Sequence, residues 1–221
     1  MTDEGLKAPK AIVFDWDGVL VETPDFIDAA FQRTKELVLP EDDGQYKNTS
    51  GLSLKEYFPT VFGERAQKAE KIFYEYVETH HLNTLKTTVG AQKLLIHLMK
   101  KNIPLFVVSN KRGDLLRKEV DYLSWNRYFN KIVGAGDCSK DKPAAVTVAT
   151  ALGHAGLNPS KDVWFVGDSA VDMECANNSG CTALLFETKS GKNTLENMKF
   201  PVNTIIFSCE DLINVVNNIK L

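Results

Sequence analysis

The sequence has few cysteines, no excess of basic residues and no long apolar run, and each absence excludes a class of protein. Its four cysteines show no CxxC spacing, so they predict neither a zinc site nor a disulfide framework but buried or half-buried thiols. Lysine and arginine number 26 against 29 acidic residues, which predicts no basic surface for nucleic acid. No stretch approaches the roughly 18 apolar residues that a membrane span requires.

The remaining bulk properties are those of an ordinary globular chain. Hydrophobic residues make up 43% of the chain and charged residues 25%. Its length of 221 residues is enough for one large domain or one and a half average ones. The first ten residues, MTDEGLKAPK, carry acids and no apolar core, unlike a secretory signal. We therefore expect a cytoplasmic protein with neither nucleic acid nor membrane as a partner.

Strand and helix patterns alternate along most of the chain. Short apolar, β-rich runs predict strands at 11–14, 104–109, 131–134, 163–167 and 182–186, with an edge strand at 204–207. Helical patterns separate these runs and close the chain. The alternation predicts an α/β fold with a doubly wound, Rossmann-like parallel sheet that is covered on both faces.

The stretch from residue 24 to about residue 85 interrupts this alternation with helical patterns only. Within it, Ser53-Leu54-Lys55-Glu56 matches a capping box, and apolar residues recur at helical spacing from Ala66 to Val77. We therefore expect a helical insertion in an α/β core. The predicted division is a core domain of residues 1–22 and 86–221 and a small helical cap domain of residues 23–85.

Polar side chains gather where predicted strands end. The first strand runs directly into Asp15-Trp16-Asp17-Gly18, and Ser109-Asn110-Lys111 closes the second. Lys142 precedes Pro143 at a helix start, and Gly167-Asp168-Ser169 is followed by Asp172, four residues after Asp168. In doubly wound sheets, ligands bind beyond the carboxyl ends of the strands. The pattern therefore predicts that the four groups share one site.

The charges of that site predict a metal ion. Asp15, Asp17, Asp168 and Asp172 would bring four negative charges together against the one positive charge of Lys142. An oxygen-rich cluster without histidine suits a hard cation, so we expect these aspartates to bind Mg²⁺. Phosphate oxygens could then be held by the ion, by Lys142 and by Ser109 with its neighbouring backbone amides.

The four motifs resemble those of the haloacid dehalogenase superfamily, specifically its phosphatases with a helical cap inserted after the first motif. Residues 15–20 match the family pattern Asp-x-Asp-Gly-x-Leu, and the remaining motifs are matched by Ser109, by Lys142, and by Asp168 with Asp172. Trp16 departs from the smaller apolar residue that is usual there. Because that position offers phosphate its backbone amide, we expect the departure to be tolerated.

This resemblance implies a Mg²⁺-dependent phosphomonoester hydrolase that acts in two steps. Asp15 would attack phosphorus and become an aspartyl-phosphate. Asp17 would protonate the leaving oxygen and later deprotonate the hydrolytic water. The ion and Lys142 would offset charge on the transferring group, which is the larger electrostatic contribution in phosphoryl transfer.

The resemblance also implies where the substrate binds. Asn110 and Lys111 after the second-motif serine resemble phosphoglycolate phosphatases, and Gly51 and Ser53 would face the site from the cap. A small organic phosphate such as phosphoglycolate is therefore expected, although sugar phosphates or nucleoside monophosphates fit the same pattern. His80 and His81, with no third ligand nearby, are interpreted as an ordinary polar helix end.

Rival interpretations come from other classes of protein. A phosphomutase of the β-phosphoglucomutase type would share the core residues and differ in the cap. A hydrolytic dehalogenase would lack the acid at Asp17, and a receiver domain would lack a helical insertion after its first acid. A catalytically idle scaffold would leave the complete motif set unexplained.

Overall fold

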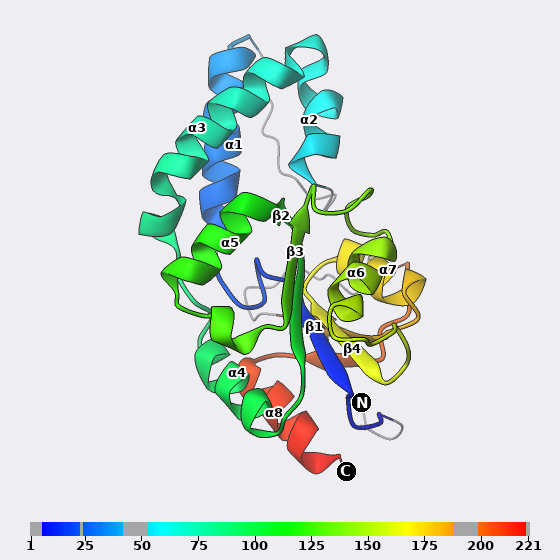
Figure 1. Cartoon of the computed structure of the whole chain (residues 1–221). Coiled ribbons are helices and arrows are strands. Elements are labelled where there is room, and N and C mark those ends of the chain that lie inside the picture. Colours follow the sequence, from blue (N-terminus) through cyan, green and yellow to red (C-terminus); the bar gives the residue numbers. More distant parts are fainter. Residues whose placement is uncertain (1–5, 23, 42–52, 188–198, 220–221) are drawn as a thin grey trace.

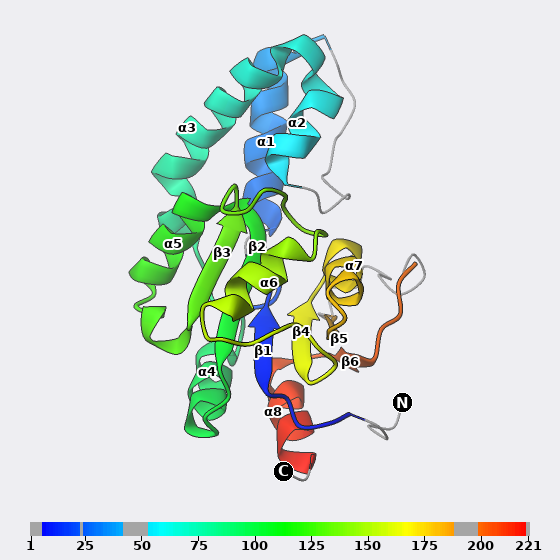
Figure 2. The same ribbon diagram turned by 45° about the vertical axis from the view of Figure 1, so that its right-hand side comes forward.

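The computed structural model describes residues 6–22, 24–41, 53–187 and 199–219. Within these ranges the chain forms a six-stranded parallel sheet with the strand order β3-β2-β1-β4-β5-β6 (Figures 1 and 2). The strands are β1 (Ala11–Phe14), β2 (Leu105–Arg112), β3 (Lys131–Ala135), β4 (Val163–Gly167), β5 (Thr182–Phe186) and β6 (Thr204–Ile206). The order reverses at β1, so the predicted doubly wound sheet is confirmed, with β6 at its edge.

Successive side chains along each strand point to opposite faces of the sheet and pack in two apolar clusters, one on each face. Ile12 and Phe14 of β1 pack in the cluster that also takes in α4 (Ala91–Lys100), α5 (Gly113–Tyr122) and α8 (Cys209–Asn218). Ala11 and Val13 pack in the other cluster, with α6 (Val146–Gly153) and α7 (Ala170–Asn178). Because both faces are covered, β1, β4 and β5 are buried along their whole length, as their unbroken apolar runs predict.

The extent of the second strand differs from the sequence prediction. The second strand does not end at Ser109 but continues to Arg112, and its pairing with β3 shifts register between Val108 and Arg112. Such an irregularity re-aims the side chains that follow it.

Helices alone fill the described part of the insertion between β1 and α4. These are α1 (Pro24–Val38), α2 (Leu54–Phe62), the short 3₁₀ helix η1 (Gly63–Arg65) and α3 (Ala66–Thr84). They enclose a third apolar cluster rich in aromatic rings, and this cluster also includes Leu115 of α5. Figure 2 shows α1, α2 and α3 beyond the end of the sheet toward which the strand arrows point. The domain division at residues 22/23 and 85/86 stays a prediction.

The start of α2 is formed differently from the expected capping box. Ser53 does occupy the N-cap position, but its side chain makes no hydrogen bond to the helix backbone. Instead, the Ser53 hydroxyl donates to Glu56 Oε2 at 3.2 Å, so the two side chains bind each other.

The burial of the cysteines agrees with the prediction. Cys175, Cys181 and Cys209 are buried, Cys138 is half-buried, and all are free thiols. Among the described residues, no helix combines the length and the apolar character needed to cross a bilayer.

Candidate active site

The first acidic residue of the site lies where β1 leaves the sheet. The backbone N–H of Asp15 donates to the carbonyl oxygen of Val166 at 2.8 Å, which ties the loop after β1 to β4. Gly18 turns this loop with a φ of +80°, and a Cβ added there would lie 2.0 Å from Asp168 Oδ2. Glycine is therefore needed both for the left-handed turn and for the approach of the loop to Asp168.

The end of β4 and the first turn of α7 supply the next two acids. Asp172 is fully buried and closes a capping box with Ser169: its Oδ2 accepts from the Ser169 backbone N–H at 3.0 Å and from the Ser169 hydroxyl at 2.6 Å. This arrangement fixes the orientation of the carboxylate and leaves Oδ1 for another partner. Asp168, half-buried, lies directly before Ser169.

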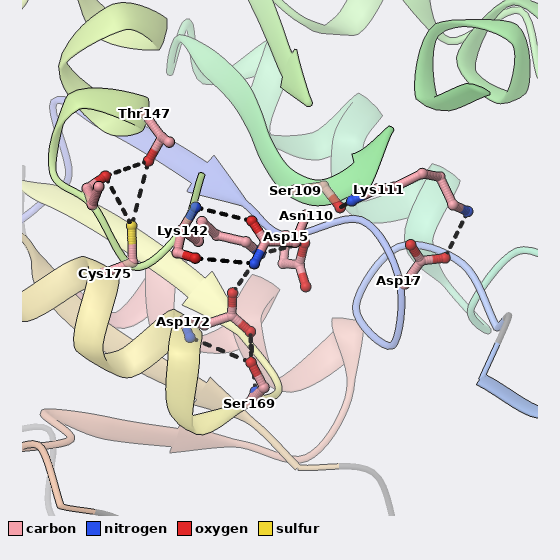
Figure 3. A network of polar contacts seen from close by, with 11 residues as sticks. Asp15, Asp17, Ser109, Asn110, Lys111, Lys142, Thr147, Ser169, Asp172 and Cys175 are labelled. Carbon is pink, nitrogen blue, oxygen red and sulfur yellow. Dashed lines mark hydrogen bonds and ion pairs between the residues drawn. The ribbon is translucent and has the colours of Figure 1, made fainter. Parts of the chain in front are cut away.

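Lys142 is that partner. Its ammonium lies 2.6 Å from Asp172 Oδ1 and 2.8 Å from Asp15 Oδ1, and its side chain is only 3% exposed (Figure 3). Asn110 holds the lysine backbone from both sides, since Oδ1 accepts from Lys142 N–H at 2.9 Å and Nδ2 donates to Lys142 C=O at 3.1 Å. The Asn110 amide therefore positions Lys142 here, and its predicted contact with substrate stays a prediction.

Oxygens of Asp15, Asp168 and Asp172 all lie within 4.8 Å of one another. The ammonium of Lys142 pairs with two of these three carboxylates, so the cluster has more negative than positive charge. Burial, together with the negative charge of Asp172, raises the pKa of Asp15 to about 7, and the same two causes raise the pKa of Asp168. Burial alone would lower the pKa of Lys142, but Asp15 and Asp172 raise it. The site thus favours a second cation.

Asp17 is placed differently from the other predicted acids. Its carboxylate is not part of the three-carboxylate group but forms an ion pair with Lys111, whose Nζ lies 2.8 Å from Asp17 Oδ1 (Figure 3). The Lys111 side chain is 6% exposed, so this lysine is not a surface residue. A metal-binding role for Asp17 stays a prediction, as does substrate binding by Lys111.

The other predicted site residues lie in varied surroundings. Ser109 is buried, and its hydroxyl accepts from the backbone N–H of Lys111 at 3.2 Å. The side chain of Trp16 is turned into the core, where it packs edge-on against Trp125 with ring centroids 5.9 Å apart. Ser53 is buried at the start of α2, whereas Gly51 lies outside the described residues.

The sequence analysis missed one group beside the site. Glu119 of α5 is 1% exposed and binds both Lys111 and Trp16, and His81 of α3 is 3% exposed and contacts the same carboxylate. His81 is therefore not an ordinary polar helix end, which corrects the earlier interpretation. Helical spacing could have revealed it, because His81 follows the buried Val77 by four residues.

Comparison with known proteins agrees with this geometry. The family model described as haloacid dehalogenase-like hydrolase matches residues 12–186 of the chain, a range that contains Asp15, Asp168 and Asp172. The chain belongs to the haloacid dehalogenase-like hydrolases. Its relatives in this family are named as phosphatases, so the protein is a phosphatase of that family.

Individual haloacid dehalogenase-like relatives cover most of the chain. Phosphoglycolate phosphatase from Aquifex aeolicus is 31% identical over 186 residues, which are 80% of this chain and 84% of the relative. Pyrophosphatase PpaX from Bacillus velezensis is 27% identical over 201 residues, 88% and 90% of the two chains. The crystal structure of a HAD-superfamily hydrolase from Ehrlichia chaffeensis matches with a TM-score of 0.67 at 27% identity, covering 96% of this chain and 98% of that one.

The close packing of the cluster leads to a prediction about Gly167, the last residue of β4. An alanine Cβ there would lie 2.2 Å from the Cβ of Asp172. We expect Gly167→Ala to displace Asp172, to lower the free energy of unfolding by about 1–3 kcal/mol and to reduce phosphatase activity, because overpacking forces neighbouring atoms to move. Urea denaturation and steady-state kinetics measure the two effects.

Gly153→Ala is the matched control, because a Cβ at this position in α6 meets nothing within 4 Å. Alanine there should keep full activity and leave stability unchanged or raise it by up to about 1 kcal/mol. Equal behaviour of the two variants would contradict the packing described for Asp172.

Proposed function

We propose that this phosphatase is a Mg²⁺-dependent phosphomonoester hydrolase that acts through an aspartyl-phosphate on Asp15. The observation that carries the proposal is the cluster of Asp15, Asp168 and Asp172, in which the ammonium of Lys142 pairs with Asp15 and Asp172. Asp15 lies at the reversal of strand order, where ligands of doubly wound sheets bind. Asp15 also belongs to the proposed cation site, and α1, α2 and α3 lie beyond this end of the sheet (Figure 2).

The donor set fits Mg²⁺. All of the clustered donors are carboxylate oxygens, which suit a hard cation, and the cluster has more negative than positive charge. Asp15, Asp168 and Asp172 would hold the ion, with Asp17 as the fourth predicted ligand. When bound, Mg²⁺ polarises phosphoryl oxygens and offsets the charge that develops on them.

The first step transfers the phosphoryl group to the protein. An oxygen of Asp15 attacks phosphorus, a new oxygen–phosphorus bond forms, and the bond from phosphorus to the ester oxygen breaks. Asp17 donates a proton to that leaving oxygen, so an alcohol departs. Lys142, held against Asp15 by the backbone contacts of Asn110, lies where it can offset negative charge during transfer.

The second step restores Asp15. Water attacks the phosphorus of the aspartyl-phosphate, Asp17 accepts a proton from that water, and the bond between phosphorus and the Asp15 oxygen breaks. Inorganic phosphate leaves and the carboxylate of Asp15 is regenerated. Ser109, buried at the end of the regular part of β2, is proposed to hold a phosphoryl oxygen through both steps together with the backbone amide of Trp16.

Phosphoglycolate is the proposed substrate, and the support comes from two sources. The Aquifex aeolicus relative is named phosphoglycolate phosphatase, and Asn110-Lys111 after Ser109 resembles that group. Pyrophosphate is the second candidate, because the Bacillus velezensis relative is named pyrophosphatase. Both are small anions, so a buried lysine such as Lys111 suits either.

The experiment compares initial rates of phosphate release from phosphoglycolate, pyrophosphate, sugar phosphates and nucleoside monophosphates at equal concentrations. We expect the highest kcat/KM with phosphoglycolate, no turnover in excess EDTA and full recovery when Mg²⁺ is added back. Turnover that is unchanged by EDTA would contradict the metal, and a higher kcat/KM for pyrophosphate would replace the proposed substrate. With a sugar phosphate, formation of its isomer faster than phosphate release would favour the phosphomutase.

A further inference from the structure

Glu119 is a buried acid that none of the four motifs contains. It lies on α5, which follows β2, and only 1% of its side chain is exposed. Burying a carboxylate costs several kcal/mol even after relaxation, and an ion pair offsets this cost only if the remaining hydrogen bonds are also made. Stability alone is therefore a weak reason for a charged group at this place.

Three polar groups bind the two oxygens of Glu119. On Oε2, the ammonium of Lys111 and the indole N–H of Trp16 both donate at 2.7 Å. On Oε1, His81 Nδ1 lies at 2.9 Å. Burial alone would raise the pKa of Glu119, but His81, Lys111 and Trp16 together lower it, so the group stays a carboxylate. It has the contacts that make a buried charge tolerable.

Two of these contacts lead to Asp17. Lys111 spans the two acids, since its Nζ is 2.7 Å from Glu119 Oε2 and 2.8 Å from Asp17 Oδ1. Trp16 is the chain neighbour of Asp17, and its hydrogen bond to Glu119 fixes the backbone from which the Asp17 side chain projects. Glu119 thus restrains Asp17 by two routes, through the side chain of Lys111 and through the main chain at Trp16.

The third contact comes from the helical insertion. His81 belongs to α3, whereas Glu119 belongs to α5 beside the sheet, and the two helices contact each other. One carboxylate therefore joins the insertion, the loop after β1 and the lysine after Ser109. The departure of Trp16 from a small apolar residue has a reason in this network, because an indole supplies a donor that an aliphatic side chain lacks.

We propose that Glu119 is a positioning residue for Asp17: it holds Lys111 and Trp16 so that the Asp17 carboxylate is oriented for proton transfer. This inference rests on the proposed function, in which Asp17 acts on the leaving oxygen and on water. Glu119 itself touches neither substrate nor metal in this account. Its effect should therefore appear in the rate of the chemical steps and depend on the presence of Asp17.

The test is a double-mutant cycle of Glu119→Gln and Asp17→Asn with Mg²⁺ and p-nitrophenyl phosphate. We expect Glu119→Gln alone to lower kcat by about 10- to 100-fold with KM changed less than about twofold, a part of the ~10²–10⁴ that a positioned acid–base group contributes. In the Asp17→Asn background the same change should cost less than about twofold. An equal loss in both backgrounds, or a raised KM with unchanged kcat, would overturn the proposal.

Glu210→Gln is the matched control, because Glu210 of α8 forms an exposed ion pair with Lys93 at 2.7 Å. It should keep the activity of the unmodified chain. Circular dichroism and thermal unfolding verify that each variant is folded. Should Glu119→Gln not fold, Trp16→Phe removes the indole donor together with part of the ring that packs against Trp125; the same dependence on Asp17 is then expected, and its absence would overturn the proposal.

A second readout separates this inference from the proposed function. The chain has three tryptophans, so its nitrogen–proton NMR spectrum should contain three indole signals, and Trp16→Phe identifies that of Trp16. Glu119→Gln should shift this signal whether or not the protein hydrolyses phosphate esters. If Asp15→Asn keeps its activity, the proposed function fails. If Asp15→Asn is inactive and Glu119→Gln is fully active, only the role of Glu119 fails.

Discussion

Replacing Asp15 with asparagine is expected to lower turnover of p-nitrophenyl phosphate by more than about 10⁴-fold, the scale typical of removing a residue that forms the covalent intermediate. Asparagine has nearly the same shape but its amide is a poor nucleophile. Steady-state kinetics in saturating Mg²⁺ measures the loss. Activity within tenfold of the unmodified chain would contradict a nucleophilic role for Asp15.

The same substitution should leave the fold intact. It removes one of three carboxylates that lie close to one another, so thermal stability without Mg²⁺ should be unchanged or higher. Asp162→Asn is the matched control, because Asp162 pairs with the exposed Lys10 at 2.6 Å, before β4 begins. It should keep full activity, which shows that loss of an aspartate charge as such is not the cause.

Replacing Lys142 with methionine is expected to affect stability and catalysis together. Without the ammonium, Asp15 and Asp172 lose the cation that pairs with both of them, and removing one partner of a buried ion pair costs about 3–5 kcal/mol. We expect this loss in urea denaturation without Mg²⁺ and a smaller loss with it. Activity should fall by about 10²–10³-fold, as when one group that stabilises transition-state charge is removed.

Lys93→Met provides the comparison for Lys142→Met. Lys93 pairs with Glu210 at the surface, where both side chains are more than half exposed, so its removal should cost less than about 1 kcal/mol and no activity. If the two variants were equally stable without Mg²⁺, the balance of charges described for the cluster would be wrong.

The positions of the four motifs could be predicted because each follows a local pattern with a fixed consequence. An apolar run that ends in Asp15 or in Gly167-Asp168 predicts a buried strand with a polar terminus, and parallel strands bring such termini to one edge. Asp15, Asp168 and Asp172 do meet there, and Lys142 lies between two of them. The helical insertion was predictable for a similar reason, because the spacing of apolar residues changes there from that of strands to that of helices.

Side-chain direction and burial of polar residues were not predictable to the same degree. Asp17 and Asp15 are two residues apart, yet Asp17 forms an ion pair with Lys111. The motif that contains the two aspartates does not indicate this pairing. Glu119 and His81 are charged or polar types, so composition favoured an exposed interpretation. The position of Glu119 in its helix indicated burial instead, because Glu119 directly precedes the buried Val120 and lies three residues after the buried Leu116.

The most direct measurement of the central claim is to identify the phosphorylated atom. The Asp17→Asn variant, which lacks the group proposed to activate water, should accumulate phosphoprotein when it is mixed with Mg²⁺ and phosphoglycolate and quenched in acid. Mass spectrometry of the digested protein is expected to find the phosphoryl group on Asp15. A phosphoryl group on any other residue would contradict the account.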